Sequence, residues 1–228
     1  LAKSDQIPNM ILVAITNPRH LRTRDLTLPK KSEKQVTSGA DHFLKFIELE
    51  VMPFIQSRFE TLDYQALAGT SHGGQFAINA FIKRPGLFDG VIAISPSLYW
   101  NNNQLLQLSE QALAKHRLRG RLYLSIANEQ ATMTKPFYKF VNMLRDEQNN
   151  ALLVASQTFS QESHNTTVLL GQYHGLKHLF SGWAIPETPQ TLADLQRIFE
   201  GRTDLLSTPM TIPEDRANGY GQWLVHLK

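Results

Sequence analysis

The chain of 228 residues contains no cysteine, and this absence excludes disulfide frameworks, thiolate zinc sites, iron–sulfur clusters and cysteine nucleophiles. It also lacks long apolar runs. Met10 to Ile15 and Val91 to Ile94 are far shorter than the roughly 18 residues that span a bilayer, so no transmembrane helix is expected. Neither charge dominates, because 23 Lys and Arg are scattered among 20 Asp and Glu. We therefore expect no nucleic-acid partner, and a small molecule or a protein is the better candidate substrate.

Hydrophobic residues make up 42% of the chain, which is enough for one compact domain with a sizeable core. Short aliphatic stretches alternate with longer amphipathic ones. The expected strands are Met10 to Thr16, Gln65 to Ala68, Val91 to Ser95, Leu122 to Ala127 and, nearer an edge, Leu152 to Ser156. The expected helices are Gly39 to Phe59 with a bend at Pro53, His72 to Arg84, Lys135 to Glu147, Thr166 to Phe180 and the short Thr191 to Phe199. This alternation predicts an α/β fold with a mostly parallel sheet and helices on both faces.

The composition changes after Trp183, where prolines become frequent. We predict a main domain over residues 1–183 and a tail over residues 184–228 that packs on it, with Trp183 in a lid or a site wall. The beginning of the chain is also unusual. Leu1 is not an initiator methionine, and the residues up to Asn9 lead directly into an interior-looking strand. The expectation is that the first strands of the domain lie upstream of this chain.

The segment from Gly69 to Gly73 matches G-x-S-x-G, the nucleophile elbow, with Ser71 at its centre. Apolar Ala66 to Ala68 precedes it and the helical stretch Gln75 to Phe81 follows, which is the strand–turn–helix context that the motif requires. The tight turn leaves almost no room for side chains two residues before and after the serine. A helix amino terminus also favours developing negative charge. The pattern predicts Ser71 as a nucleophile; the alternative is a glycine-rich turn that merely caps a helix.

A serine nucleophile needs a base, which in α/β-hydrolase order follows the acid further along the chain. His164 lies in the polar loop Gln161 to Asn165, between the fifth expected strand and the last crossover helix. This is where the base belongs, so we predict His164 in that role, with an ordinary loop histidine as the alternative. The backbone N–H of His72, next to Ser71, is the expected oxyanion donor.

The remaining histidines fit the role of base less well. His20 and His42 precede the serine, while His116 and His226 lie in a basic connection and at the extreme end of the chain. His174 and His178 are spaced i, i+4 in the last crossover helix, but no third ligand accompanies them. We interpret them as exposed or half-buried helix residues and expect no metal site.

The orienting acid should follow the strand that ends at Ala127, and Glu129 offers a carboxylate at that place. A carboxylate there would hold the imidazole tautomer and stabilise the imidazolium. The alternative is a solvated loop glutamate. Asp146 and Glu147 are poorer candidates because they lie on a helix.

Several segments together resemble the putative esterase family of α/β-hydrolases, which includes the enterobactin and salmochelin siderophore esterases. They are Ile11 to Ile15, Arg22 to Thr27, Gly69 to Gly74, Phe88-Asp89 and Ile94 to Trp100. The similarity extends over about Ile7 to Phe180, and the combination is far more specific than the elbow alone. The chain is also similar to esterase D and S-formylglutathione hydrolase.

The resemblance implies an α/β-hydrolase in which Ser71 is the nucleophile, His164 the base and the His72 N–H an oxyanion donor. It implies no cofactor and no metal. It further implies that a second oxyanion donor belongs to a segment upstream of this chain, and that Glu129 could contribute little, because some siderophore esterases have a weak or missing acid. His72 stands where many relatives carry Phe, Met or Leu. The stretch from Asn218 to Leu224 resembles the point where related chains continue into a helical extension.

Four further residues are candidates for the substrate-binding mouth. Arg22 and Arg24, with Asp25, either form a surface loop with salt bridges or shape an acyl or siderophore pocket, since arginine suits planar anionic groups. Tyr99 and Trp100 follow the Ser-Pro-Ser turn after a core strand and would line the same mouth. Core packing is nearly as good an interpretation of Trp100.

We therefore expect a serine esterase that cleaves a carboxylic ester through an acyl-serine intermediate, with a siderophore-type lactone as a candidate substrate. Acyl transfer to an alcohol would use the same residues. A non-catalytic binding module would keep the elbow only as a stable turn, and the order of serine, acid and histidine argues against it. The sequence leaves open the ester, the oligomeric state and the choice between cytoplasm and periplasm.

Overall fold

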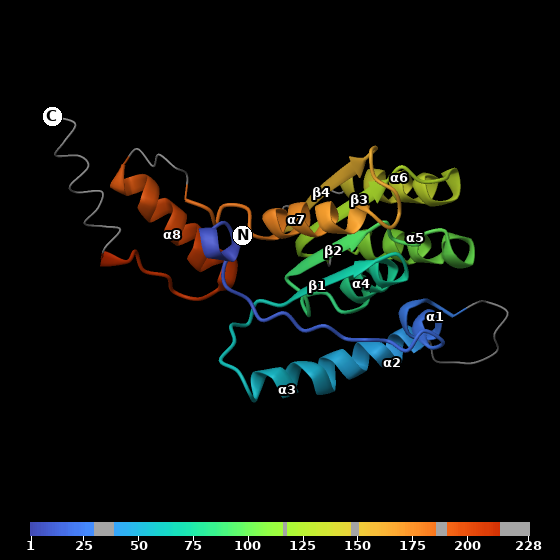
Figure 1. Ribbon diagram of the computed structural model, residues 1–228, viewed down its shortest axis with the longest axis horizontal. Coiled ribbons are helices and arrows are strands. Elements are labelled where there is room, and N and C mark those ends of the chain that lie inside the picture. The colour runs from blue at the N-terminus through green and yellow to red at the C-terminus, as the bar shows by residue number, and fades with distance from the viewer. Residues whose placement is uncertain (30–38, 116–117, 147–150, 186–190, 215–228) are drawn as a thin grey trace. The chain divides into compact units, whose positions relative to one another are not determined.

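The structure, a computed structural model, describes residues 1–29, 39–115, 118–146, 151–185 and 191–214. The chain divides into two compact units (Figure 1). One, here called the sheet unit, comprises Ala14–Thr61 and Gln65–Leu179; the other, the end unit, comprises Leu1–Val13, Leu62–Tyr64 and Phe180–Lys228. Within the described ranges, no helix has both the length and the apolar character needed to cross a membrane.

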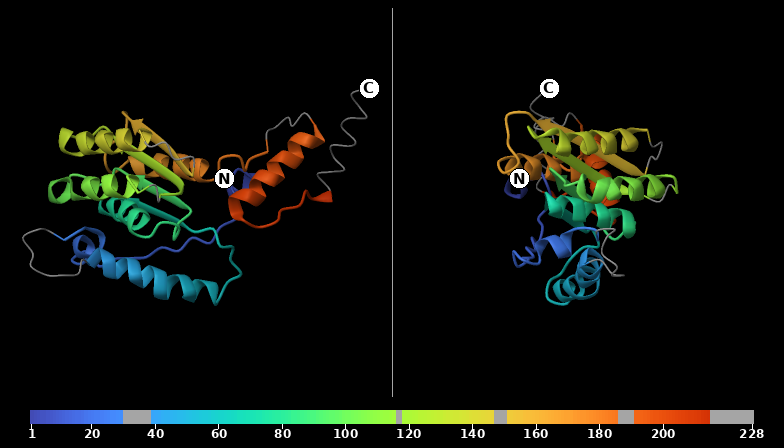
Figure 2. Two further views of the ribbon diagram at one scale, coloured as in Figure 1. Left: turned by 180° about the vertical axis from the view of Figure 1, so that it is seen from behind. Right: turned by 90° about the vertical axis from the view of Figure 1, so that its right-hand side faces the viewer.

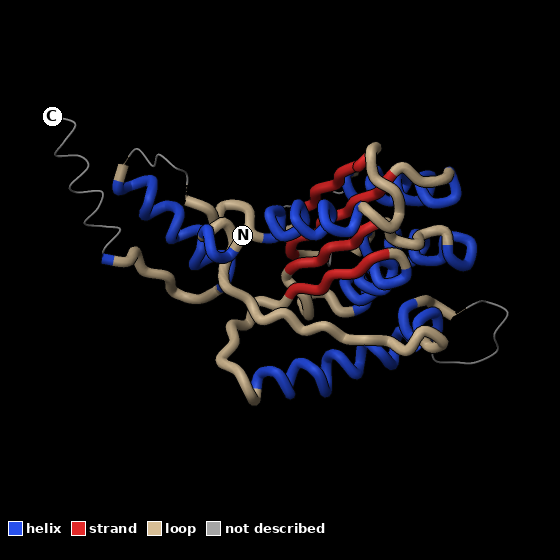
Figure 3. The backbone as a smooth tube through the Cα atoms, in the orientation of Figure 1, coloured by secondary structure: helices blue, strands red, loops and turns tan. Residues whose placement is uncertain are grey.

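The sheet unit is built on four parallel strands in the order β1-β2-β3-β4. They are β1 (Ala66–Thr70), β2 (Gly90–Ile94), β3 (Gly120–Ala127) and β4 (Leu152–Phe159), drawn in red in Figure 3. Thr70 pairs with Ile94, which pairs with Ser125, so the carboxyl ends of the strands meet at one edge. The predicted α/β class and four of the five predicted strands are confirmed.

Helices cover both faces of this sheet (Figures 1 and 2). On one face lie α4 (His72–Lys83), α5 (Trp100–Leu113) and α6 (Ala131–Arg145), and on the other lies α7 (Thr167–Leu179). Two glycines let α7 approach closely: a Cβ on Gly171 would lie 2.8 Å from the side chain of Ile94, and one on Gly175 would lie 2.7 Å from that of Ile92. All five residues of β2 are consequently buried, as a central parallel strand requires.

A second helical layer packs outside α4. It consists of α1 (Arg22–Leu26), α2 (Gly39–Phe46), the π-helical η2 (Ile47–Val51) and α3 (Met52–Gln56). Leu26, Leu44 and Phe76 belong to one buried cluster, which joins this layer to α4. Near Pro53 the regular α-helix is interrupted: Ile47–Val51 is π-helical, and Pro53 stands in the first turn of α3, where a residue without a backbone N–H is tolerated.

The stretch Met10 to Thr16, predicted as a core strand, forms no strand, and this prediction is wrong. Leu12 is 88% exposed, and the apolar residues beside it are also exposed. A strand exists only by pairing with a neighbour, and no described strand pairs with this stretch (Figure 3). The β-branched and aliphatic composition indicated that this segment could form a strand. It did not indicate whether a neighbouring strand would pair with it.

Helices α1 and α5 were not predicted from the sequence. In α5, the run Asn101 to Asn103 has left-handed backbone angles, with φ between 49° and 59°. Asparagine tolerates this conformation better than most residues, so the run is typical of a turn. The sequence pattern therefore did not indicate the helix that follows the run. The helix expected at Lys135 to Glu147 begins earlier, at Ala131, and residue 147 lies outside the described residues.

The end unit contains η1 (Ala2–Ser4) and α8 (Leu192–Leu206). Thr191 caps α8 by accepting a hydrogen bond from the backbone N–H of Asp194 at 3.1 Å, and the helix runs beyond the predicted end at Phe199. Trp183 is 5% exposed, and its indole N–H donates to Asp5 at 3.1 Å. It is thus a buried packing residue within the end unit. Much of the predicted tail, residues 186–190 and 215–228, lies outside the described residues.

Candidate active site

Ser71 stands alone between the end of β1 and the start of α4, with φ 59° and ψ −119°. A positive φ is costly for a residue with a side chain, so the surrounding structure must hold it in place. The N–H of Ser71 donates to the carbonyl of Ile94 at 2.9 Å, and the carbonyl of Ser71 accepts from the N–H of Ser97 at 3.1 Å. The turn after β2 therefore clamps the backbone of the predicted nucleophile from both sides.

The glycines around Ser71 are not equally constrained. A Cβ on Gly69 would lie 2.1 Å from the carbonyl oxygen of Gly73, and one on Gly74 would lie 3.1 Å from that of Gly69. A Cβ on Gly73 would meet nothing within 4 Å. The expectation that residues both two before and two after the serine lack room is thus correct for Gly69 and wrong for Gly73. Gly74 is the glycine after the serine that close packing requires.

Glu129 and His164 come from the loops that follow β3 and β4, and the structure brings them together. Nδ1 of His164 lies 3.2 Å from Oε1 of Glu129. The side chain of Glu129 is 5% exposed and that of His164 is 39% exposed, so the pair extends from the interior toward solvent. The two loops are joined because the N–H of Asn128 donates to the carbonyl of Glu162 at 2.9 Å. A carboxylate on one imidazole nitrogen leaves the other nitrogen available for proton transfer.

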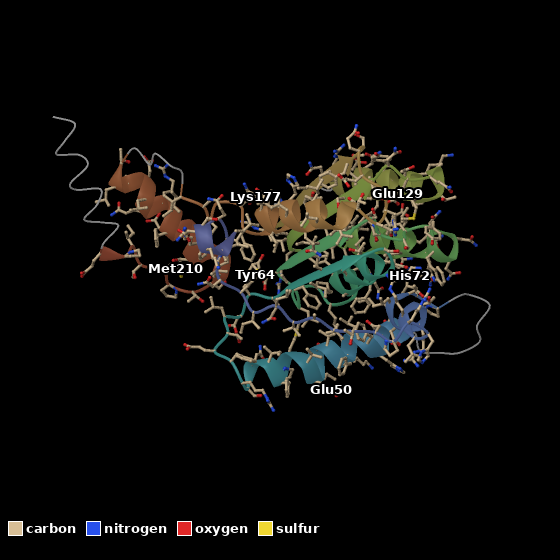
Figure 4. The ribbon with its side chains drawn as sticks, viewed as in Figure 1. Glu50, Tyr64, His72, Glu129, Lys177 and Met210 are labelled. Carbon is tan, nitrogen blue, oxygen red and sulfur yellow. The ribbon has the colours of Figure 1, made fainter. Side chains whose placement is uncertain are left out.

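His72 begins α4, directly after Ser71. No hydrogen bond to a described residue engages its backbone N–H, which therefore remains available at the helix amino terminus. Its ring packs edge-on against Trp100, with 5.2 Å between the centroids. Burial lowers the pKa of the imidazole, and the nearby charges of Arg22 and His164 lower it further. The lowered pKa favours the uncharged form of this imidazole. Figure 4 labels His72 and Glu129.

The four predicted substrate-binding residues differ in their surroundings. Arg22 lies in α1, close enough to His72 to depress its pKa. Arg24 is 62% exposed at its side chain and pairs with Asp25 at 2.7 Å. Both arginines are on a short helix, so the expected surface loop is wrong, although the expected salt bridge is present.

The two aromatic candidates are also unlike each other. Tyr99 precedes α5 and is 42% exposed. Trp100 donates its indole N–H to the carbonyl of Leu28 at 2.9 Å and supports the ring of His72. Trp100 thus packs against the ring of His72, while Tyr99 is exposed to solvent.

The i, i+4 histidines of α7 are engaged in packing. His178 lies 3.2 Å from the carbonyl oxygen of Leu153 and contacts the ring of Tyr123, and His174 contacts Phe159. Among the described residues, no group of three or more His, Asp or Glu side chains is arranged to hold a metal ion. His116 and His226 lie outside those residues.

Two serines of the turn after β2 were not assigned a role from the sequence. The hydroxyl of Ser95 donates to Oε1 of Glu129, and the hydroxyl of Ser97 lies 3.3 Å from that of Ser71. Both serines are almost completely buried. The sequence did indicate that both serines follow a core strand, at the sheet edge where the elbow lies. It could not indicate which side chains their hydroxyls contact.

Comparison with known proteins gives a family match. The model of the family described as "Putative esterase" matches residues 1–183. The chain is 46% identical over 83 residues to the siderophore triacetylfusarinine C esterase of Aspergillus fumigatus, covering 36% of this chain and 28% of the relative. It is 44% identical over 71 residues to the siderophore enterobactin esterase of Emericella nidulans, covering 30% and 23%. The matched regions thus span less than a third of these relatives' length.

Solved structures show the same fold. An IroE-like serine hydrolase from Shewanella oneidensis superimposes with a TM-score of 0.70 at 24% identity, covering 92% of this chain and 66% of that one. The siderophore hydrolase EstB from Aspergillus nidulans superimposes with a TM-score of 0.63 at 25% identity, covering 75% and 68%. At 24% identity, the first of these similarities shows a shared fold alone.

Proposed function

The chain belongs to the putative esterase family, and from this membership we propose that the protein is a serine esterase that hydrolyses a carboxylic ester through an acyl-Ser71 intermediate. The observation that supports the proposal most strongly is a serine in a strained elbow at the same sheet edge as the pair formed by buried Glu129 and partly exposed His164. These are the parts of an activated nucleophile. The relatives named above are esterases and hydrolases, so we propose water rather than an alcohol as the acyl acceptor.

In the proposed reaction, the hydroxyl oxygen of Ser71 attacks the ester carbonyl while His164 takes the hydroxyl proton. The resulting oxyanion accepts a hydrogen bond from the backbone N–H of His72. The C–O bond to the leaving alcohol then breaks, and His164 returns the proton to that alcohol. Water, deprotonated by His164, attacks the acyl-Ser71 carbonyl, releases the carboxylic acid and restores the Ser71 hydroxyl.

Glu129 acts in this scheme through His164. Its carboxylate accepts from Nδ1–H, which keeps the other imidazole nitrogen free to accept the Ser71 proton, and it stabilises the imidazolium that forms. The burial of Glu129 strengthens this electrostatic effect because little water screens it. The lowered pKa of His72 disfavours a second positive charge near the developing imidazolium.

We propose further that the ester belongs to a siderophore or a similar polyfunctional molecule. The names of the two fungal relatives support this substrate class. Arg22 beside His72 would favour an anionic or electron-rich acyl group, and the exposed ring of Tyr99 would offer it a stacking surface.

The test is ester hydrolysis by the intact protein. We expect turnover of p-nitrophenyl butyrate, and more efficient turnover of enterobactin or triacetylfusarinine C. Ser71→Ala should lower kcat by about 10³-fold or more, because the acyl-enzyme can no longer form. Folded protein that hydrolyses neither type of ester, or a Ser71→Ala variant with full activity, would contradict the proposed function. Hydrolysis of the simple ester alone would contradict only the substrate class.

A further inference from the structure

The carboxylate of Glu129 is held at one oxygen. Oε1 accepts the Ser95 hydroxyl and lies 3.2 Å from Nδ1 of His164, whereas Oε2 is buried and makes no hydrogen bond with any described residue. A buried carboxylate without donors is costly, so each donor it has strongly influences where it sits. A group that orients another group must itself be fixed by something other than that group. Here Ser95 provides that independent contact.

Ser95 is well suited to hold a neighbour in place. It is completely buried, it directly follows β2, and its N–H donates to the carbonyl of Ser125 at 2.7 Å. Its backbone has φ 43°, and the next residue, Pro96, has a ring-restricted φ. The backbone of Ser95 is therefore fixed, and its complete burial limits the side-chain rotamers that could turn the hydroxyl away from Glu129.

The same turn also holds the nucleophile. The carbonyl of Ile94 accepts from the N–H of Ser71, and the N–H of Ser97 donates to the carbonyl of Ser71. β2 lies between β1, which leads to Ser71, and β3, which leads to Glu129. One short turn thus contacts both the serine and the acid, and sets their separation.

We propose that Ser95 is a positioning residue for the esterase reaction: its hydroxyl fixes the Glu129 carboxylate, which in turn aligns the His164 imidazole with Ser71. This inference rests on the proposed function. Ser95 touches neither the ester nor the reacting atoms. Its contribution therefore belongs to the chemical step and not to substrate binding, and it depends on the presence of Glu129.

The experiment is a double-mutant cycle measured with p-nitrophenyl butyrate. Ser95→Ala should lower kcat about 10-fold with KM changed less than about twofold, and Glu129→Ala should lower kcat more. In the Glu129→Ala background, Ser95→Ala should have no further effect, because the group it positions is absent. Ser95→Gly should behave like Ser95→Ala, which separates the lost hydroxyl from any strain of an alanine at positive φ.

Ser125→Ala is the matched control. Ser125 is as buried as Ser95, and its carbonyl accepts a hydrogen bond from the N–H of Ser95. Its hydroxyl has no hydrogen-bond partner among the described residues. Its removal should leave kcat and KM unchanged. A general effect of deleting a buried hydroxyl in this region would instead lower the activity of Ser125→Ala as well, and would overturn the proposal.

Other outcomes separate this inference from the proposed function. If Ser71→Ala and Glu129→Ala lose activity but Ser95→Ala does not, the positioning role is wrong and the esterase stands. If Ser95→Ala lowers kcat equally in both backgrounds, Ser95 acts through the fold and not through Glu129, and the positioning role is again wrong. If Ser71→Ala keeps full activity, the proposed function itself fails.

Discussion

His72 places a half-buried polar ring directly after the proposed nucleophile. Nδ1 of this ring is buried without a hydrogen bond to any described residue, and burial together with Arg22 and His164 lowers its pKa. The sequence could show that a polar residue stands next to Ser71. It could not show that the pKa of the ring is lowered, because the burial and the charge of Arg22 that lower it come from other elements.

A second histidine with a lowered pKa, His178, allows a test at the same scale. Burial lowers the pKa of His178, the charge of Arg121 lowers it further, and the bond to the carbonyl of Leu153 raises it in part. Between the ordinary value of 6.5 and the lowered pKa, the unfolded chain binds a proton at this position more readily than the folded protein does. The unfolded state then binds more protons, so the free energy of unfolding falls as the pH falls from 6.5 to the lowered pKa.

We predict that His178→Gln reduces this acid sensitivity. Glutamine can still donate to the carbonyl of Leu153 but does not titrate. The measurement is the free energy of unfolding by urea at pH 7.5 and pH 5.5. The wild-type protein should lose more stability between the two pH values than the variant does. Equal losses would show that His178 does not carry the effect.

Among single residues, predictions from the sequence succeeded where position along the chain was enough. Glu129 and His164 were expected at the ends of neighbouring strands, and the structure brings their side chains to 3.2 Å. Ser95 was missed because its role depends on which way one hydroxyl points. Parallel register determines which residues reach the same edge, but the conformation of individual side chains does not follow from it.

At the scale of elements, the elbow depends on one close approach between β1 and α4. The carbonyl of Gly73 occupies the space where a Cβ of Gly69 would stand, 2.1 Å away. Gly73 has open space at its own Cβ position and lies near the start of a helix. The motif therefore contains one glycine that the packing demands and one that it does not.

We predict opposite effects of the same substitution at these two positions. Gly69→Ala should destabilise the protein by about 1–3 kcal/mol or more, because the backbone must shift to relieve the contact. Gly73→Ala should stabilise it by about 0.4–1 kcal/mol, because alanine loses less conformational entropy in a helix. Urea unfolding of both variants checks this. A Gly69→Ala variant as stable as the wild type would contradict the geometry of the elbow.

The elements themselves were predictable where their partners follow within the chain. The strands around β2 were identified by apolar runs separated by helices, since a βαβ unit brings such runs side by side. Met10 to Thr16 has the same composition but no described partner, so it forms no strand. The three asparagines at the start of α5 indicated a turn, but they did not indicate the helix that continues after it.

At the scale of the whole molecule, the end unit joins segments that are distant in sequence. Arg202 is 4% exposed, and its guanidinium donates to the carbonyl of Trp183 and to Asp5 at 2.7–3.0 Å. It also lies 4.3 Å from the centroid of the Trp183 ring and 4.7 Å from that of Phe199. Contacts between residues 5, 183 and 202 leave no local pattern, so the sequence could not predict them.

We predict that Arg202→Met destabilises the end unit by about 2–4 kcal/mol, since it removes the hydrogen bonds that the Trp183 carbonyl and the Asp5 carboxylate accept from the buried guanidinium. Arg197→Met is the control on the same helix. Arg197 is 77% exposed and pairs with Asp194 at 3.4 Å, so its loss should cost less than about 1 kcal/mol. Urea unfolding, followed by tryptophan fluorescence, compares the two. Equal effects would show that the buried cluster contributes no more than a surface pair.

The central claim is that Ser71 is a nucleophile activated by His164, and covalent labelling tests it most directly. The intact protein is treated with a fluorophosphonate, and peptide mass spectrometry locates the adduct. We predict an adduct on Ser71, no adduct in Ser71→Ala, and labelling at least about 10²-fold slower in His164→Ala, because the base is missing. Folded protein that takes up no label, or that takes it up equally fast without His164, would contradict the account.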